Sequence, residues 1–551
     1  MAAPSSGLVL GGGAVFLSPR LRSAMTLNTP LYPVASAGLI QRWWSVGLSE
    51  LAYAHAVPAA TLTWGLVAVF LVGMPVADSL PFIGTYDSQR LCEIALFLWA
   101  AGLMMLSEER AHGGRLFQAL PRRAHWGLGL VFALGVASAL LAPRPRYALL
   151  EVSSFLLMGV LAVHLASFFQ RHRTEPLRLV KPVLVLGTMA YLTVFLVGHA
   201  QALVVGGSLW PRALPGFAHV RMFNQWQVWV MPLLIAFVAL APKRRERWGL
   251  RILLAGMVML LIASGGRGAT LALVGSSLLI GALYRRAASA WLREAALAAG
   301  LGGAMYLLFF RVLASGNLSV LDRAGLGTSG RDLLWAKALH LIAEHPVFGY
   351  GPMHFAYDPS PLAAHPHNLV LQWATEWGLP AAIILLGLLG WGGVAWLRRT
   401  RSAVYQGAPE SLWLMGLTSA LSASLANALV DGSVIAPLSQ VGWAVLGALL
   451  LAAYSGMDSG QRPPSTALKA GANSKLGWMG RLVVAAAALV MVTNMSLDVP
   501  TLHRRDYDYR AVRFSRMAPL RFWSQGRIAD VEDPAVIRRV EQLARELAAD
   551  R

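Results

Sequence analysis

Two histidines two positions apart, His365 and His367, are the residues of this chain best suited to acid–base chemistry. They lie in the stretch AHPHN (364–368), directly before an apolar segment that carries Gln372 and Glu376. Histidine accepts a proton near neutral pH, as the activation of a hydroxyl nucleophile requires. Two histidines at this spacing can also share a cation, although no carboxylate or cysteine cluster lies beside them in the sequence. A purely structural pair is the third alternative.

Arginine is the second residue type here that suits a chemical role, because its guanidinium offers phosphate oxygens a rigid fork of donors and keeps its charge. Arg267 lies in SGGRG (264–268), a turn that joins two apolar segments with almost no loop. Arg212 and Arg221 flank another short connection, and Arg331 precedes the histidines. Several arginines that converge at a membrane surface would bind a lipid-linked diphosphate. The alternative is that they only reach lipid headgroups.

The composition of the chain is typical of an integral membrane protein. Of its 551 residues, 56% are hydrophobic and 13% charged, whereas soluble domains carry about 25% charged residues. The mean hydropathy is +0.54, and the apolar blocks are about 18 to 24 residues long, enough to cross a bilayer core. The net charge of +20 does not indicate nucleic-acid binding, because the basic residues cluster between apolar blocks, where they set membrane orientation. The single cysteine, Cys92, allows no internal disulfide and no cysteine-based metal site.

We predict an all-α polytopic membrane protein with about thirteen transmembrane helices. The third and fourth spans are joined by the short connection PRPR (143–146), and 456–477 is a flexible connection rich in Gly, Ser and Pro. The predicted spans are 58–77, 91–107, 125–142, 148–169, 182–205, 223–241, 250–265, 268–284, 295–313, 378–397, 411–430, 434–455 and 479–498.

Basic residues predict the two sides of the membrane, because cytoplasmic loops carry an excess of Lys and Arg. Every second connection is basic, which predicts a cytoplasmic N-terminus and an outer C-terminus. The apolar run 8–17 fits a signal peptide poorly, since no basic residue precedes it. The predicted parts are a cytoplasmic N-terminal tail (1–57), transmembrane helices 1–9 (58–313), a periplasmic catalytic loop (314–377), transmembrane helices 10–13 (378–498) and a periplasmic helical C-terminal tail (499–551).

Several short motifs occur in an order that resembles the O-antigen ligase superfamily. The resemblance covers residues 264–385 and departs from the family pattern at two places. Two extra glycines stand in the Ser-Arg-Gly element, and Ala381 or Ala382 replaces the last glycine of a helix entry. The motifs are SGGRG (264–268), SGRDLLW (329–335), EHPVFGYG (344–351), HPHN (365–368) and EWGLP (376–380).

The resemblance implies a GT-C-like helical fold and an enzyme of the bacterial inner membrane that uses neither metal nor nucleotide sugar as a cofactor. Such enzymes transfer a glycan from undecaprenyl diphosphate to a hydroxyl. Carried over by motif, Arg267 and Arg331 would bind the diphosphate, and we add the outward-facing Arg221 and Arg212. His367 would be the catalytic residue. The supporting residues would be Asn368, His365 and Trp335.

The family leaves the acceptor open among a lipid A-core sugar, a protein Ser or Thr, and, for an O-antigen polymerase, another lipid-linked glycan. The stretch VRMFNQ (220–225) and the long outer tail are more similar to pilin-type protein O-oligosaccharyltransferases than to lipopolysaccharide ligases.

Two other classes of function are less consistent with the sequence. A transporter or flippase for lipid-linked glycans needs ionisable residues in the middle of its spans. Here Glu93 and Glu151 lie near span ends, and no repeat relates two halves of the chain. A receptor or scaffold would not require arginines on the outer surface.

Overall fold

A computed structural model describes most of the transmembrane region and part of the connections. The predicted N-terminal tail, Arg212, residues 314–329 and nearly all of the helical pattern after Pro534 lie outside the described residues. The described residues are 59–74, 84–106, 116, 120–172, 176–205, 216–217, 219–313, 330–357, 363–457, 475–502, 520–524, 526, 528 and 538.

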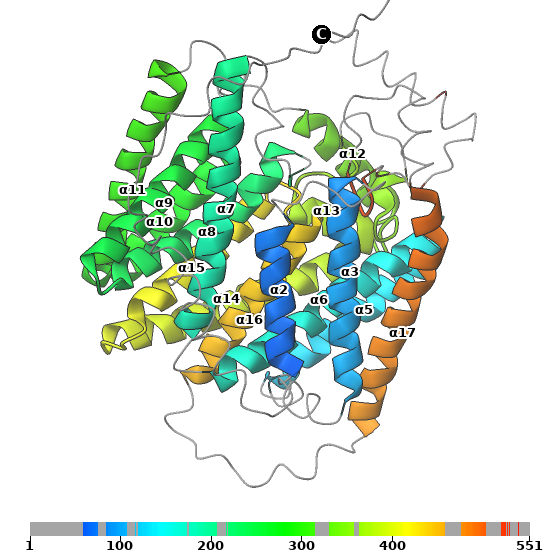
Figure 1. The fold of residues 1–551 in the computed structure, drawn as a ribbon. Coiled ribbons are helices and arrows are strands. Elements are labelled where there is room, and N and C mark those ends of the chain that lie inside the picture. The colour runs from blue at the N-terminus through cyan, green and yellow to red at the C-terminus, as the bar shows by residue number, and fades with distance from the viewer. Residues whose placement is uncertain are drawn as a thin grey trace, which may run out of the picture. The chain divides into compact units, whose positions relative to one another are not determined.

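Within these ranges the chain is helical and contains no strand, and a helix coincides with each of the thirteen predicted spans (Figure 1). Proline in the first turn marks the start of α6, α14 and α16, as its fixed φ favours. The helices at the spans are α2 (Ala59–Gly73), α3 (Thr85–Met105), α5 (Arg122–Leu141), α6 (Pro145–Arg171), α7 (Pro176–Val205), α8 (Val220–Leu240), α9 (Arg244–Ala263), α10 (Arg267–Tyr284), α11 (Ser289–Leu307), α14 (Leu379–Tyr405), α15 (Ser411–Ala428), α16 (Pro437–Gly456) and α17 (Lys475–Asp498). Two shorter helices, α12 (Arg331–Glu344) and α13 (Leu369–Trp377), lie between α11 and α14.

Eight segments of the described chain are long and apolar enough to cross a membrane, and one of them, Arg267–Val312, contains both α10 and α11. The prediction of an all-α polytopic membrane protein is confirmed, whereas the number of spans stays a prediction. Helix α3 is less apolar because its first turns carry Asp87, Gln89 and Arg90. These side chains are buried inside the protein, so that α3 does not present them to lipid.

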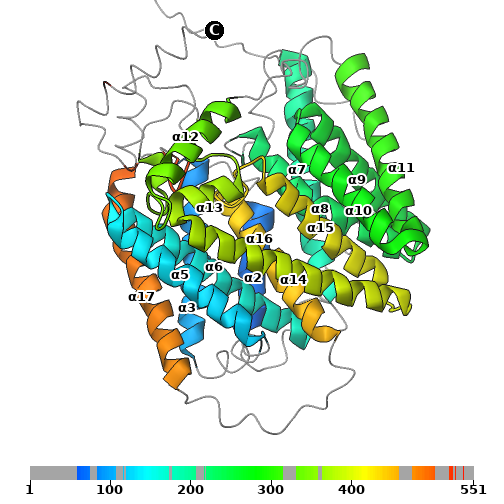
Figure 2. The same ribbon diagram turned by 180° about the vertical axis from the view of Figure 1, so that it is seen from behind.

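The core of the bundle lies around α6 and α8. Helix α6 packs against α2, α3, α5, α16 and α17, and α8 packs against α9, α11 and α15 (Figures 1 and 2). In its most apolar stretch α8 is 89% buried, whereas α14 is 17% buried. Exposed Leu271 on α10 and Ile383 on α14 are typical of helix faces that contact lipid.

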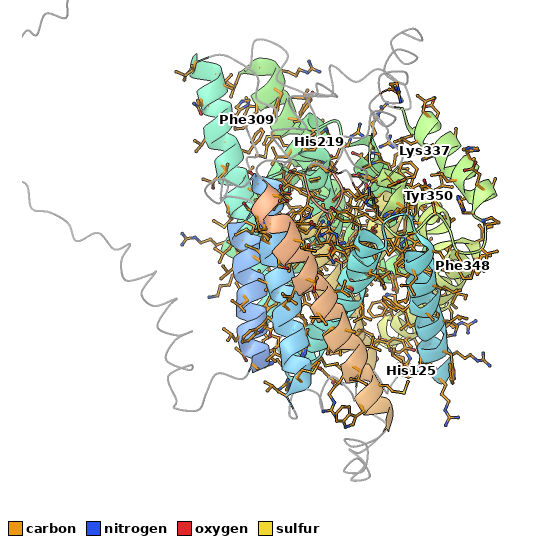
Figure 3. All side chains as sticks on the ribbon, turned by 90° about the vertical axis from the view of Figure 1, so that its right-hand side faces the viewer. His125, His219, Phe309, Lys337, Phe348 and Tyr350 are labelled. Carbon is orange, nitrogen blue, oxygen red and sulfur yellow. The ribbon has the colours of Figure 1, made fainter. Side chains whose placement is uncertain are left out.

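One end of the bundle carries α12, α13 and the connection between α15 and α16. Figure 3 shows His219, Lys337 and Tyr350 towards this end and His125 at the opposite one. We call it the α12 end. By the alternation of the helices it also holds the start of α8, the start of α10 and the end of α17, so that residues from distant parts of the chain meet there.

Candidate active site

Asn368 fixes the C-terminal side of the turn that carries the two histidines. It is the N-cap of α13, and its Oδ1 accepts a hydrogen bond from the Leu371 N–H at 3.0 Å. Its Nδ2 donates to the Leu429 carbonyl at 3.0 Å, in the connection between α15 and α16. Asn368 therefore joins the histidine turn to a connection that is distant in the sequence.

His367 has a backbone conformation that non-glycine residues rarely adopt. Its φ of 51° lies in the left-handed region, and residues held in such conformations concentrate at functional sites. The His367 N–H donates to His365 Nδ1 at 3.3 Å, and the two ring centroids lie 4.1 Å apart. Trp335 of α12 donates from Nε1 to the Pro366 carbonyl at 3.1 Å. Contacts from α12 and α13 thus hold the turn in place.

Asp431 faces His367 and was not predicted from the sequence. Its Oδ1 lies 3.6 Å from His367 Nδ1 and accepts a hydrogen bond from the Gly432 N–H at 2.7 Å. Burial raises the pKa of Asp431, but His367, the Gly432 N–H and Arg221 outweigh burial and hold it below its ordinary value. The carboxylate is therefore charged at neutral pH. A carboxylate beside Nδ1 orients the imidazole and leaves Nε2 to exchange a proton.

His365 has a different environment from His367. Its ring packs against Gly432, where an added Cβ would lie 2.2 Å from His365 Cε1, so that a larger residue does not fit. Burial lowers the pKa of His365 well below its ordinary value, and the positive charge of Arg521 acts in the same direction. His365 is therefore neutral, and it accepts the hydrogen bond that shapes the turn.

Three of the four predicted arginines come together at the α12 end. Arg221, Arg267 and Arg331 each lie in the first turn of a helix, α8, α10 and α12 respectively. Burial lowers the pKa of Arg331, and the charges of Arg221 and Arg267 lower it further, whereas Asp431 acts in the opposite direction. A guanidinium keeps its charge despite such shifts. Three like charges beside helix N-termini form a region suited to an anion.

The chain packs closely against two neighbours in the turn at the start of α10. A Cβ at Gly266 would lie 2.7 Å from Asn224 Oδ1 of α8, and a Cβ at Gly268 would lie 2.7 Å from a methyl group of Val430. Asn224 Nδ2 also donates to Ser264 Oγ at 2.8 Å. The glycines of this turn therefore let α10 begin close to both α8 and the connection that carries Asp431.

His219 is a second residue that was not predicted from the sequence. As the N-cap of α8, its Nδ1 accepts a hydrogen bond from the Arg221 N–H at 3.1 Å. Burial lowers the pKa of His219 to about 4, with Arg221 and His367 acting in the same direction and Asp431 opposing them. His219 is therefore neutral and fixes the backbone at Arg221. A search for polar residues in every short connection on the predicted outer side would have found both Asp431 and His219.

The structure thus brings most of the predicted site residues together. His365, His367 and Asn368 form one turn, which Trp335 contacts from α12. Arg221 and Arg331 lie near Asp431, and Arg267 lies near Arg331. Arg212 lies outside the described residues. In the part of the chain that the structure describes, no group of three or more His, Cys, Asp or Glu residues is placed to hold a metal ion.

Comparison with known proteins finds a similarity in the segment that carries most of these residues. A family model described as O-Antigen ligase matches residues 252–386. The chain is also 31% identical over 160 residues to a protein named O-antigen ligase from Pseudomonas aeruginosa strain PAO1; the aligned region covers 27% of this chain. The chain spans only 33% of the length of that curated relative. Arg221 and Asp431 lie outside the segment that the family model matches.

Proposed function

We propose that the chain is a glycosyltransferase of the bacterial inner membrane, because residues 252–386 match the O-antigen ligase family model and the chain is similar to an O-antigen ligase. It moves a glycan en bloc from undecaprenyl diphosphate to an acceptor hydroxyl on the periplasmic side. The observation that carries the proposal is the placement of a His367–Asp431 pair at the same end of the bundle as Arg221, Arg267 and Arg331.

His367 serves as the general base in this reaction. Its Nε2 accepts the proton of the acceptor hydroxyl while the hydroxyl oxygen forms a bond to the anomeric carbon of the glycan. The bond between that carbon and the phosphate oxygen breaks, and the diphosphate leaves with the electron pair. Asp431, 3.6 Å from Nδ1, compensates the positive charge that develops on the imidazole.

The three arginines stabilise the departing diphosphate. A diphosphate is already a good leaving group, so that the site mainly supplies positioning and positive charge. Guanidiniums provide both through paired N–H donors, and this scheme requires no cofactor.

The acceptor is a lipid A-core sugar or a protein Ser or Thr, as in a ligase or an O-oligosaccharyltransferase. The name of the Pseudomonas aeruginosa relative supports a ligase over an O-antigen polymerase, in which the acceptor is another lipid-linked glycan. All three acceptors present a hydroxyl and receive the glycan from the same donor. The proposed chemistry is therefore common to them.

Reconstitution with defined substrates tests the proposal. The purified protein, given undecaprenyl-diphosphate-linked glycan in the presence of a chelator, should transfer the glycan to one of the three acceptors. Product would be followed by mass spectrometry, with boiled protein as the control. Transfer that stops with the chelator and returns with a divalent cation would instead favour a metal site at His365 and His367.

The orientation of the chain is tested separately. A topology reporter fused after Asp498 should report the periplasm, whereas one placed in 456–477 should report the cytoplasm. A cytoplasmic signal after Asp498 would remove the periplasmic placement of the site.

A further inference from the structure

A short segment near the C-terminus, residues 520–524, is buried in the α12 end of the bundle. Arg521 and Trp523 are each 2% exposed, and Phe522 is 6% exposed. We call this segment the clasp. It belongs to the predicted C-terminal tail, yet its side chains are among the least accessible of the protein.

Arg521 of the clasp joins two helices through their carboxylates. It donates to Glu151 of α6 at 2.7 and 2.8 Å and to Glu376 of α13 at 2.8 and 2.6 Å. With its amide turned to face Arg521, the Gln372 oxygen accepts a further hydrogen bond at 2.8 Å. All four contacts to the two carboxyls come from Arg521 Nη2, and Nη1 contacts Gln372, so that one guanidinium fixes α13 relative to α6.

The opposite side of the clasp contacts α3 and, through it, the start of α16. Arg90 of α3 donates from Nε to the Phe522 carbonyl at 2.9 Å. The same guanidinium donates to the Ile435 carbonyl at 2.5 Å and to Gln440 Oε1 at 2.6 Å. Asp87 of α3 accepts hydrogen bonds from the Ser524 N–H and Oγ at 2.6 and 2.7 Å.

These contacts reach both elements that present the proposed catalytic pair. Glu376 lies on α13, whose N-cap Asn368 directly follows His367. Ile435 lies in the connection between α15 and α16, four residues after Asp431. The clasp therefore connects the element that carries His367 to the element that carries Asp431.

Stability alone is a poor explanation for this arrangement. Burial of charged groups costs desolvation, and replacement of such a cluster by apolar side chains is often neutral or stabilising. A network of directed hydrogen bonds has a different use, because a catalytic pair must be held within about half an ångström of its productive geometry.

We propose that Arg521 is a positioning residue, which sets the distance between His367 and Asp431 by fixing α13. The expected effect of Arg521 on glycan transfer rests on the proposed function, whereas its expected effect on the position of α13 does not. Arg521 does not touch the reacting groups. Its loss should therefore slow the chemical step and leave Arg221, Arg267 and Arg331, which bind the donor in the proposed function, in place.

Three variants test the role of Arg521. Arg521→Met removes the guanidinium that contacts both carboxyls. Arg521→Met combined with Glu151→Gln and Glu376→Gln also removes the two carboxylates that the first variant leaves without a cation. Arg538→Met is the matched control, since Arg538 is an exposed arginine of the same C-terminal region.

For each variant we would measure kcat, the KM for the lipid-linked donor, the Tm, and the hydrogen exchange of residues 363–372. Arg521→Met should lower kcat roughly tenfold to hundredfold, as small misplacements of catalytic groups do, with little change in the donor KM. The triple variant should regain most of the lost Tm without regaining kcat. Exchange at 363–372 should increase in both, and Arg538→Met should behave as the unmodified protein.

Two results would overturn the proposal. One is a triple variant whose kcat returns together with its Tm, because Arg521 would then only neutralise buried carboxylates. The other is unchanged exchange at 363–372 in Arg521→Met. If the unmodified protein transfers no glycan to any acceptor, the proposed function fails, and the exchange experiment still decides whether Arg521 controls the histidine turn.

Discussion

Arg331 and Arg521 lie at the same end of the bundle, but their neighbours carry opposite charges. Burial lowers the pKa of both guanidiniums. At Arg331 the charges of Arg221 and Arg267 lower it further, whereas at Arg521 the carboxylates of Glu151 and Glu376 outweigh burial and raise it. Positive charges held together favour the entry of an anion, whereas an arginine between two carboxylates is already neutralised. We therefore propose that Arg331 binds the substrate, whereas Arg521 positions the catalytic pair.

The largest effect should come from the proposed catalytic pair, His367 and Asp431. His367→Ala should abolish transfer, because general-base catalysis and charge balance contribute about 10²- to 10⁴-fold. Asp431→Asn should lower kcat nearly as much, since the imidazole loses its orienting carboxylate. His365→Ala should keep an appreciable fraction of the activity, because His365 is neutral and acts only through the turn. The initial rates of glycan transfer would be compared among purified variants that had inserted into the membrane equally well.

A fully active His367→Ala variant would remove the general base from the account. Equal losses in His365→Ala and His367→Ala would mean that the two imidazoles act as one structural unit.

The next largest effect should separate the two arginine sites. Arg331→Ala or Arg267→Ala should lower transfer roughly hundredfold, mostly through donor affinity, as the truncation of one partner of a hydrogen-bonded charge pair typically does. Lys at either position should rescue poorly, because an ammonium offers a point charge without the fork. Arg521→Met should change kcat instead. If all three variants changed the same kinetic parameter, the distinction between the two sites would be wrong.

A smaller effect is expected where the histidine turn meets the connection that carries Asp431. Gly432→Ala places a methyl group where only 2.2 Å separates it from His365 Cε1, so that the turn must move. We expect kcat to fall by about tenfold. Gly392→Ala is the control, because nothing lies within 4 Å of a Cβ at that position. Similar activity in the two variants would show that the turn tolerates displacement.

The smallest effect concerns stability near the clasp. Burial raises the pKa of Glu376 to about 8, with Arg521 opposing and Glu151 adding to the shift, so that at neutral pH the two carboxyls hold one proton between them and their remaining charge balances Arg521. A carboxyl whose pKa is raised by folding stabilises the protein most below its ordinary value of 4.5 and loses that contribution as the pH rises towards 8. Glu376→Gln should therefore flatten the decline in Tm between these pH values, by a few degrees at most.

Thermal unfolding of the detergent-solubilised protein across this pH range would measure the effect. Glu410→Gln serves as the control, because Glu410 is exposed. Parallel Tm curves for Glu376→Gln and the unmodified protein would show that Glu376 ionises in the folded protein as it does in the unfolded chain.

The sequence predicts the parts of this structure that depend on local pattern. Apolar blocks specify helices because a lipid-exposed backbone must satisfy its own hydrogen bonds. The order of the motifs predicts His367, Arg267 and Arg331, which lie within or beside short recognisable stretches. Asn368, predicted as a supporting residue, is the N-cap of α13.

Other residues of the site carry no such local signal. Asp431 and His219 lie in short connections outside the recognisable motifs, and only the packing of α8, α10 and α15 brings them near His367 and Arg331. Arg521 lies 145 positions after its partner Glu376. Glu151, noted in the sequence only as a residue near a span end, is the other partner of Arg521. Contacts of this kind depend on tertiary structure and follow no spacing along the chain.

The most direct test of the account separates donor binding from the chemical step. Binding of an undecaprenyl diphosphate-linked glycan and single-turnover transfer would be measured on His367→Ala, Arg331→Ala and the unmodified protein. We predict that His367→Ala binds the donor normally but does not transfer the glycan, and that Arg331→Ala loses most of its donor affinity. Normal donor binding by Arg331→Ala, or normal transfer by His367→Ala, would contradict the account.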